Sequence, residues 1–282
     1  MATQTVSRVA GGEAAVIGKL NYSLRSADRP RYHANDTTRD VLHLDTRETV
    51  IHNGRLLPVA PTLEAEGFKL VRATTAVTDF RDDRQTGGIY AEEVRDIVQR
   101  ESGADKVVIT GPGVLRFAEK SSESGERSNS RPARFIHNDV SGPTARAMAA
   151  RVLGGEAELA NYRGFTLFNL WRTFSAPPQD VPLAMLDGRT LDAGDLIAAD
   201  AVFDERDKPE WSFEGFLVHH DPRQRWVYFP DMDAGEALLF TTFTYRDGQP
   251  FCVPHSGFDD PTCPADAGPR ASIEMRAIAF FR

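Results

Sequence analysis

Short runs that are rich in β-forming residues fill the chain from residue 162 onward. They are GFTLFNLWRTF, WSFEGFLVHH, QRWVYFP, EALLFTTFTY and RASIEMRAIAFF, and turn-forming segments such as DGR, DPRQ, RDGQ and DDP separate them. Many short strands joined by turns indicate a barrel or jelly roll rather than a parallel α/β sheet. We therefore expect a mainly β fold with flanking helices, of the α+β class.

Two segments show helical periodicity instead. In YAEEVRDIVQRESGADK, the apolar residues Val94, Ile97 and Val98 lie at helical spacing, and Gly103 is placed to end the helix. The segment PTARAMAARVLGG, after Ser141-Gly142, predicts a second helix that ends at Gly154. Between the two helices, KVVIT predicts a short buried strand.

The first half of the chain contains one hairpin signal and one low-complexity stretch. VLHLDTRETVIHNGR alternates around Asn53-Gly54 and predicts a hairpin with its turn there. EKSSESGERSNSRPA, residues 119–133, has almost nothing to bury and predicts a mobile surface loop. We expect one domain over residues 1–282, comprising a helix/strand extension (1–118), this loop (119–133), which is a candidate lid, and a core (134–282).

Charge and cysteine content narrow the class of protein. The net charge of −8 gives no basic field for nucleic acid, and no stretch approaches the ~20 apolar residues that span a bilayer. The N-terminal segment has no apolar core of the kind that signal peptides carry. Two cysteines, Cys252 and Cys263, are too few for a disulfide framework, so we expect free thiols and a cytoplasmic protein.

The segment RFIHNDVSGP contains a candidate metal half-site. In an extended strand, His137 and Asp139 point to the same side. An imidazole nitrogen and a carboxylate oxygen then face one ion, and a 2-His-1-carboxylate triad needs one more histidine. On its own the pair is more often surface decoration. The third ligand is open between His220, before a turn, and His255, in VPHSGFDDP.

The last predicted strand, RASIEMRAIAFF, places polar side chains on one face. These are Arg270, Ser272, Glu274 and Arg276. Such a face is either half solvated or presents a guanidinium and a hydroxyl into a barrel mouth, where they suit the distal carboxylate of 2-oxoglutarate. Arg270 is the first candidate for this anchor, and Arg276 is its rival.

Three further residues are candidates for the pocket. Tyr228, in RWVYFP, is a possible donor to the co-substrate, while core packing is the alternative. Asn169 and Trp171 share a strand face and either line the substrate pocket or pack in the core.

Taken in order, the motifs carry a family resemblance. They are LNY (20–22), GF (67–68), GADKVVI (103–109), HNDVS (137–141), NLWR (169–172), PLAMLDGRTL (182–191), RWVYFPDM (225–232), EALLF (236–240), PHSGFDDP (254–261) and RASIEMRA (270–277). The chain resembles the asaB-like hydroxylase/desaturase family, which is related to the cephamycin methoxylation subunit and to gibberellin-desaturase-like enzymes. These are similar to Fe(II)- and 2-oxoglutarate-dependent oxygenases with a double-stranded β-helix (jelly-roll, cupin-like) core.

The resemblance implies His137, Asp139 and His255 as iron ligands, and Arg270 with Ser272 as the co-substrate anchor. It also implies O2 as oxidant and hydroxylation or desaturation of a small secondary metabolite or amino-acid derivative, with release of succinate and CO2. Two alternatives stay open: a cupin-like metal enzyme without a keto-acid co-substrate, and a catalytically silent jelly-roll binding protein. We expect no nucleic-acid or membrane partner, and a homodimer is possible.

Overall fold

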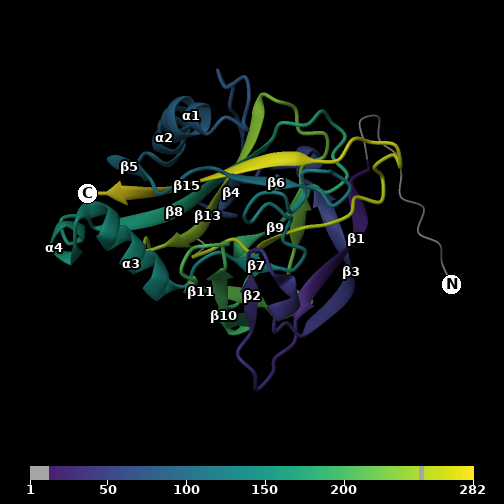
Figure 1. Ribbon diagram of the computed structural model, residues 1–282, viewed down its shortest axis with the longest axis horizontal. Helices are drawn as coiled ribbons and strands as arrows, with labels where there is room; N and C mark the ends of the chain where they lie inside the picture. Colours follow the sequence, from purple (N-terminus) through teal and green to yellow (C-terminus); the bar gives the residue numbers. More distant parts are fainter. Residues whose placement is uncertain (1–12, 248–250) are drawn as a thin grey trace.

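Two β-sheets lie face to face, with the helices on the outside (Figure 1). This arrangement comes from a computed structural model, in which residues 13–247 and 251–282 are described. The predicted mainly β fold with flanking helices and a jelly-roll core is confirmed.

Among the described residues, the larger sheet has nine strands in the order β1-β3-β12-β9-β14-β7-β11-β10-β2. Their bounds are β1 Ala15–Ser23, β2 Arg31–His33, β3 Leu44–Asn53, β7 His137–Asn138, β9 Leu183–Leu186, β10 Leu196–Phe203, β11 Trp211–Val218, β12 Trp226–Tyr228 and β14 His255–Gly257. Strands far apart in sequence are therefore neighbours in space, and the short strands β7 and β14 lie side by side at the middle of the sheet.

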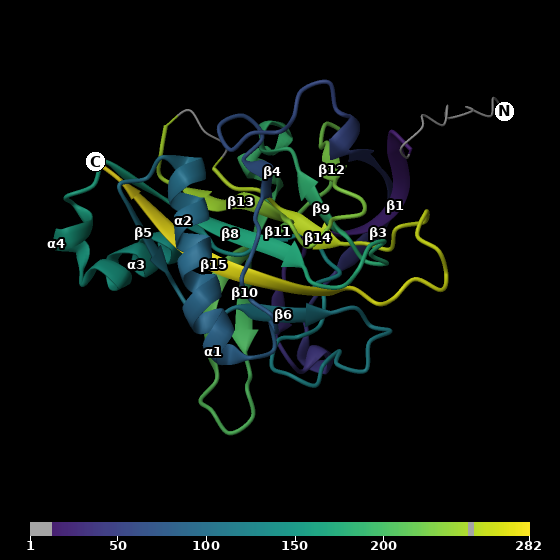
Figure 2. The ribbon, with the colours of Figure 1, turned by 90° about the horizontal axis from the view of Figure 1, so that it is seen from above.

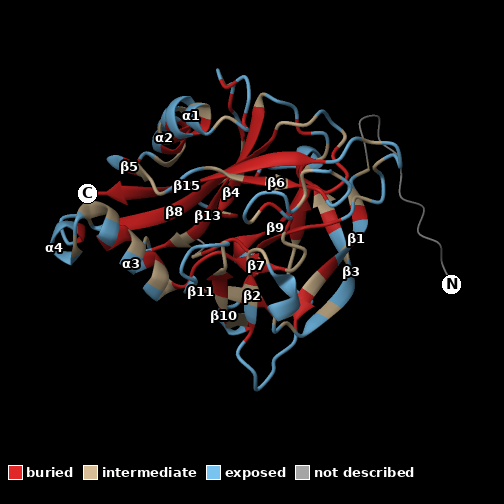
Figure 3. Cartoon of the chain, in the orientation of Figure 1, coloured by how far each residue is buried: buried red, intermediate tan, exposed pale blue. Residues whose placement is uncertain are grey.

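In the described part of the chain, the smaller sheet has six strands. Five follow the order β4-β13-β8-β15-β5, and β6 also pairs with β15. Their bounds are β4 Phe68–Arg72, β5 Lys106–Ile109, β6 Val114–Phe117, β8 Gly164–Thr173, β13 Glu236–Thr244 and β15 Ala271–Phe281. The long central strands β8, β13 and β15 are buried almost throughout (Figure 3).

The helices end where the sequence predicts. Helix α2 (Ala91–Ser102) stops at Gly103, whose φ of 67° is a left-handed conformation that glycine adopts without strain. Helix α3 (Gly142–Leu153) is capped by the Ser141 side chain and stops at Gly154. The short helices α1 (Asp83–Gln85) and α4 (Glu156–Leu159) precede α2 and follow α3. Within the described residues, no helix has the length and apolar character needed to cross a membrane.

The two faces of strand β15 contribute to two different apolar clusters of the core. On the outer face, Ile273 and Met275 pack against α2, which crosses over the strand (Figure 2). On the inner face, Ile278 and Phe280 belong to an apolar cluster that includes buried alanines of α3. The remaining inner positions, toward the start of the strand, are polar. Because side chains alternate between the two faces of the strand, one face packs in the core while the start of the other face presents polar side chains.

The N-terminal 118 residues contribute strands to both sheets. β1, β2 and β3 belong to the nine-stranded sheet, whereas β4, β5 and β6 belong to the six-stranded sheet. This part of the chain is therefore built into the two sheets rather than set beside them.

The predicted hairpin at Asn53-Gly54 is wrong. β3 does end at Asn53, but Gly54 begins a 3-10 turn, and β3 pairs with β1 and, in parallel, with β12. A Cβ on Gly54 would lie 2.4 Å from the ring of Phe229, so glycine is required here by close packing and not by a hairpin turn. A local turn signal does not reveal such a long-range contact.

Replacing Ile273 by alanine should lower the free energy of unfolding by about 2–5 kcal/mol, because the side chain is fully buried between β15 and α2. The matched control is Ile17→Ala on β1, where the side chain is 64% exposed and the expected change is within about 0.5 kcal/mol. Urea unfolding of both variants measures the difference. Equal losses would contradict this account of the core.

Candidate metal centre

Two histidines and one aspartate converge between the sheets. His137 on β7 and His255 on β14 are directly paired across the strands, with ring centroids 4.4 Å apart. Asp139 Oδ1 lies 3.6 Å from His137 Nε2 and 3.9 Å from His255 Nε2. One ligand atom from each residue lies within 4.8 Å of the others, so the three can hold one metal ion. Of the two candidates for the second histidine, the structure brings His255 to the pair.

Both histidines are oriented by the backbone. Nδ1–H of His137 donates to the Phe135 carbonyl at 3.1 Å, and Nδ1–H of His255 donates to the Val253 carbonyl at 3.2 Å. These bonds leave each Nε2 free of a proton and directed to the cluster. Burial lowers the pKa of His137 to about 4 and also lowers the pKa of His255. Both rings are therefore neutral at pH 7, which is the form that binds metal.

Asp139 is held from the opposite sheet. Its Oδ2 accepts a hydrogen bond from Asn169 Nδ2 on β8 at 2.7 Å and lies 3.5 Å from Arg276 Nη2 on β15. Arg276 also pairs with Glu274, at 3.0 Å. Burial by itself would raise the pKa of Asp139, but the positive charge of Arg276 and the Asn169 hydrogen bond outweigh it, so the pKa lies well below its usual range. The carboxylate is thus ionised, with Oδ1 facing the histidines.

Arg270 is buried without a carboxylate partner. Its side chain is 2% exposed, and Nε and Nη2 find no hydrogen-bond partner among the described residues. The guanidinium lies over the Trp171 ring at 5.6 Å, and its backbone N–H donates to Asp180 at 2.9 Å. Burial, with the nearby cation Arg116, lowers the pKa of Arg270 to about 9, so the group stays charged at neutral pH. A buried, unpaired guanidinium edge fits a carboxylate ligand.

The polar face predicted for the last strand is present, and it is buried except at the partly exposed Arg276. Ser272 is fully buried and its Oγ donates to the Arg116 carbonyl at 3.3 Å. Arg276 faces Asn169 across β8 and β15, and Glu274 faces Trp171. Arg276 is already engaged by Asp139 and Glu274, whereas the guanidinium of Arg270 forms no ion pair with any described carboxylate. This difference distinguishes the two arginines that the sequence left as rivals.

Tyr228 is not brought to the cluster. Its neighbour Val227 pairs with Met185, which pairs with His255, so these three side chains share one face of the sheet. Tyr228 therefore points to the other face, where its ring meets Phe258 with centroids 5.4 Å apart. The role suggested for Tyr228 as a donor to the co-substrate does not fit this placement.

Three residues near the cluster were not found from the sequence. Phe135 lies between Tyr32 and His137, with ring centroids 4.9 Å and 5.4 Å from them. Arg116 on β6 pairs with Ser272 and so lies on the same inner face. Tyr32 and Arg116 come from the first 118 residues. No local sequence pattern predicts that they lie near the cluster, because only the pairing of β2 and β6 with distant strands brings them there.

Known proteins match the chain over most of its length. The sequence family described as an oxidoreductase/YMDC permease-like domain matches residues 20–280. The hydroxylase/desaturase CTB9 of Cercospora beticola is 30% identical over 257 residues, covering 84% of this chain and 77% of that protein.

The chain belongs to this oxidoreductase family.

Two further relatives are similar to the chain over more than two thirds of its length. The Fe(II)/2-oxoglutarate-dependent dioxygenase nvfI of Aspergillus novofumigatus is 29% identical over 199 residues, covering 71% of this chain and 69% of that protein. The oxidoreductase clz16 of Cochliobolus lunatus is 28% identical, covering 82% and 84%. The solved structure of the iron and alpha-ketoglutarate-dependent endoperoxidase NvfI superposes with a TM-score of 0.78 at 23% identity, over 95% of this chain and 98% of that chain. That likeness establishes the shared fold.

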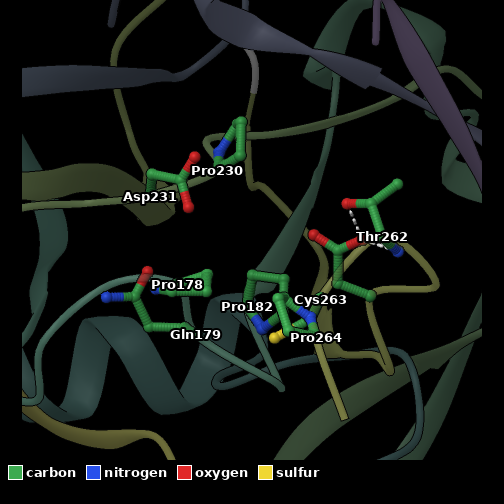
Figure 4. Close-up of a pocket in the computed structure, with 9 residues that line it drawn as sticks. Pro178, Gln179, Pro182, Pro230, Asp231, Thr262, Cys263 and Pro264 are labelled. Atoms are coloured by element: carbon green, nitrogen blue, oxygen red, sulfur yellow. Dashed lines mark hydrogen bonds between the residues drawn. The ribbon is translucent and has the colours of Figure 1, made fainter. Parts of the chain in front are cut away.

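Two surface cavities of this oxidoreductase lie apart from the metal cluster. One, of about 260 Å³, is walled by prolines, with Gln179 and Asp231 beside it (Figure 4). The other, of about 480 Å³, is lined by Arg134 and its ion-pair partners Glu119 and Asp259. Neither is lined by a member of the His-Asp-His cluster or by Arg270.

Replacing Asn169 by alanine should weaken metal binding about 10–100-fold, because Asp139 Oδ2 loses its 2.7 Å donor and the carboxylate is freed to rotate. Anaerobic titration of the protein with Fe(II) measures the dissociation constant. The control is Asn161→Ala, an exposed asparagine before β8 that should leave the metal affinity unchanged. An unchanged affinity in Asn169→Ala would show that Asn169 does not position the ligand.

Proposed function

We propose that this protein is a non-haem Fe(II)- and 2-oxoglutarate-dependent dioxygenase, a hydroxylase/desaturase of a small secondary metabolite or amino-acid-derived compound. The observation that carries the proposal is the His137-Asp139-His255 cluster together with the buried, unpaired guanidinium of Arg270, which immediately precedes strand β15 of the facing sheet. The names of relatives such as nvfI support the same reaction class. Fe(II) and 2-oxoglutarate together supply the oxidising power from O2, with release of succinate and CO2.

The three ligands have distinct roles in this proposal. His137 and His255 offer neutral Nε2 atoms, because their Nδ1–H groups are bound to backbone carbonyls. Asp139 offers a carboxylate whose other oxygen is kept in place by Asn169 and Arg276. A set of two nitrogens and one oxygen leaves further positions open for the co-substrate and for O2.

Arg270 is our candidate for the 2-oxoglutarate anchor. The Nε and Nη2 atoms form one edge of a planar fork that matches a carboxylate, and burial strengthens that pairing. Ser272 is the accompanying hydroxyl, on the same face two residues further along. Trp171 lies under the guanidinium, which supports a role for this tryptophan beside the anchor, and its predicted role in lining the substrate pocket stays a proposal.

Several finer points belong to the same proposal. We place the chain in the asaB-like branch, related to the cephamycin methoxylation subunit, on the motifs that run in order along it. We propose a single catalytic domain whose segment 119–133 acts as a lid. The free thiols of Cys252 and Cys263 support a cytoplasmic location. We propose a small-molecule substrate and no nucleic-acid or membrane partner, and a homodimer remains a candidate assembly.

With Fe(II), ascorbate and O2, the wild-type protein should form succinate from 2-oxoglutarate even without its own substrate. The variant His137→Ala should lose at least about 100-fold of this rate, because one of only two imidazole ligands is gone. Chromatographic measurement of succinate gives the result, and Asn161→Ala serves as the unaffected control.

Two outcomes would favour the alternatives. Metal binding without any succinate would support a cupin-like enzyme that uses no keto acid. Absence of both metal binding and succinate in the wild type would support a silent binding protein.

Replacing Arg270 by glutamine should raise the KM for 2-oxoglutarate at least about tenfold, because the distal carboxylate loses a charge-assisted pair. Replacing Arg276 by glutamine should instead weaken Fe(II) binding, since Arg276 is bound to Asp139 and not to the co-substrate. Initial rates over a range of 2-oxoglutarate concentrations, at saturating Fe(II), separate the two effects. A raised KM in the Arg276 variant alone would make Arg276 the anchor.

A further inference from the structure

Arg116 is a third guanidinium on the inner face, and no carboxylate of the described residues forms an ion pair with it. The residue lies on β6, pairs with Ser272 of β15, and is thus next to the positions of Arg270 and Glu274 on the same face. Its cross-strand partner Ser272 is on the same face of β15 as Arg276, which contacts Asp139, so Arg116 lies on the face that meets the metal cluster.

The hydrogen bonds of Arg116 use one end of the guanidinium only. Nη1 donates to the carbonyl of Asn129 at 3.0 Å, to its side-chain Oδ1 at 2.9 Å and to the carbonyl of Arg131 at 2.8 Å. All three acceptors are neutral, and no carboxylate of the described residues lies within ion-pair distance. The Nε and Nη2 atoms, which form the bidentate edge, have no acceptor in the described part of the chain.

The other cations of this face are accounted for. Arg276 forms ion pairs with both Asp139 and Glu274, and Arg270 binds 2-oxoglutarate under the function proposed above. Among the described residues, Arg116 is therefore the guanidinium of this face that neither the protein nor the proposed co-substrate supplies with a counter-charge. A half-buried cation of this kind gains most from a carboxylate that approaches its free edge.

We propose that Arg116 binds a carboxylate of the substrate that is oxidised, so that the substrate class is a small carboxylic acid. This rests on the proposed function, because it takes Arg270 to be occupied by 2-oxoglutarate. Tyr32 and Phe135, whose rings meet beside His137, supply an aromatic wall for the apolar part of such an acid. Arg116 is thereby a specificity-determining residue. The acid would bind next to the loop 119–133, because Nη1 of Arg116 donates to carbonyls of that loop.

The test uses the enzyme loaded with Fe(II) and 2-oxoglutarate under anaerobic conditions. Benzoic, cinnamic and decanoic acids, each with its methyl ester, are titrated by calorimetry. We expect the wild type to bind at least one acid about tenfold or more tightly than its ester, because esterification removes the charge that Arg116 pairs with. Arg116→Gln should abolish this preference, and Arg116→Lys should restore it only in part, since lysine keeps the charge but not the planar fork.

A matched control separates binding from loop tethering. Asn129→Gly removes the side-chain oxygen that accepts from Arg116, keeps the guanidinium, and suits the positive φ of 55° at this position. It should retain the acid preference. Loss of the preference in Asn129→Gly to the same extent as in Arg116→Gln would overturn the proposal in favour of a structural role in the loop.

Two further results would also overturn it. Equal binding of every acid and its ester by the wild type would exclude a carboxylate site. A rise in the KM for 2-oxoglutarate in Arg116→Gln, matching that in Arg270→Gln, would assign Arg116 to the co-substrate. Both are distinguishable from failure of the proposed function, which is the absence of succinate formation by the wild type.

Discussion

The carboxylate of Asp139 joins the two sheets. One oxygen faces the Nε2 atoms of His137 and His255 in the nine-stranded sheet, and the other is bound by Asn169 and lies beside Arg276 in the six-stranded sheet. A buried carboxylate without partners would be costly, so the two sheets must meet in the register that supplies both sets of partners. The same relative position of the two sheets therefore sets both the geometry of the site and the packing of the core.

The two faces of β15 have different roles: one packs in the core, and part of the other carries the polar residues of the site. Its outer face packs against α2, and the apolar end of its inner face packs with α3, so the strand is fixed along its whole length. The polar part of the inner face then presents Arg270, Ser272 and Arg276 at set positions. Because neighbouring positions differ in what pairs with them, we propose different tasks for Arg276 and Arg270 on this face and for Arg116 on the adjacent strand β6: orienting a ligand, anchoring a co-substrate and selecting a substrate.

Local patterns predicted much of this architecture. The helical spacing of Val94, Ile97 and Val98 and the glycines at 103 and 154 predicted where two helices lie and end, because these signals act within a few residues. The prediction of a hairpin at Asn53-Gly54 was wrong for the same reason, namely that the signal is local. A two-residue turn signal carries no information about β1 and β12, which are the strands that β3 pairs with.

The sequence by itself predicted the class of fold from its many short strands and turns. A period of two residues predicted that His137 and Asp139 point to one side and that the last strand has a polar face. The sequence left His220 and His255 open as third ligand, and Arg270 and Arg276 as anchor. Only the tertiary structure decided that His255 lies against His137, that Arg276 is already paired, and that Tyr228 faces away. It also brought in Tyr32 and Arg116, because strand pairing joins segments that are more than 100 residues apart in the chain.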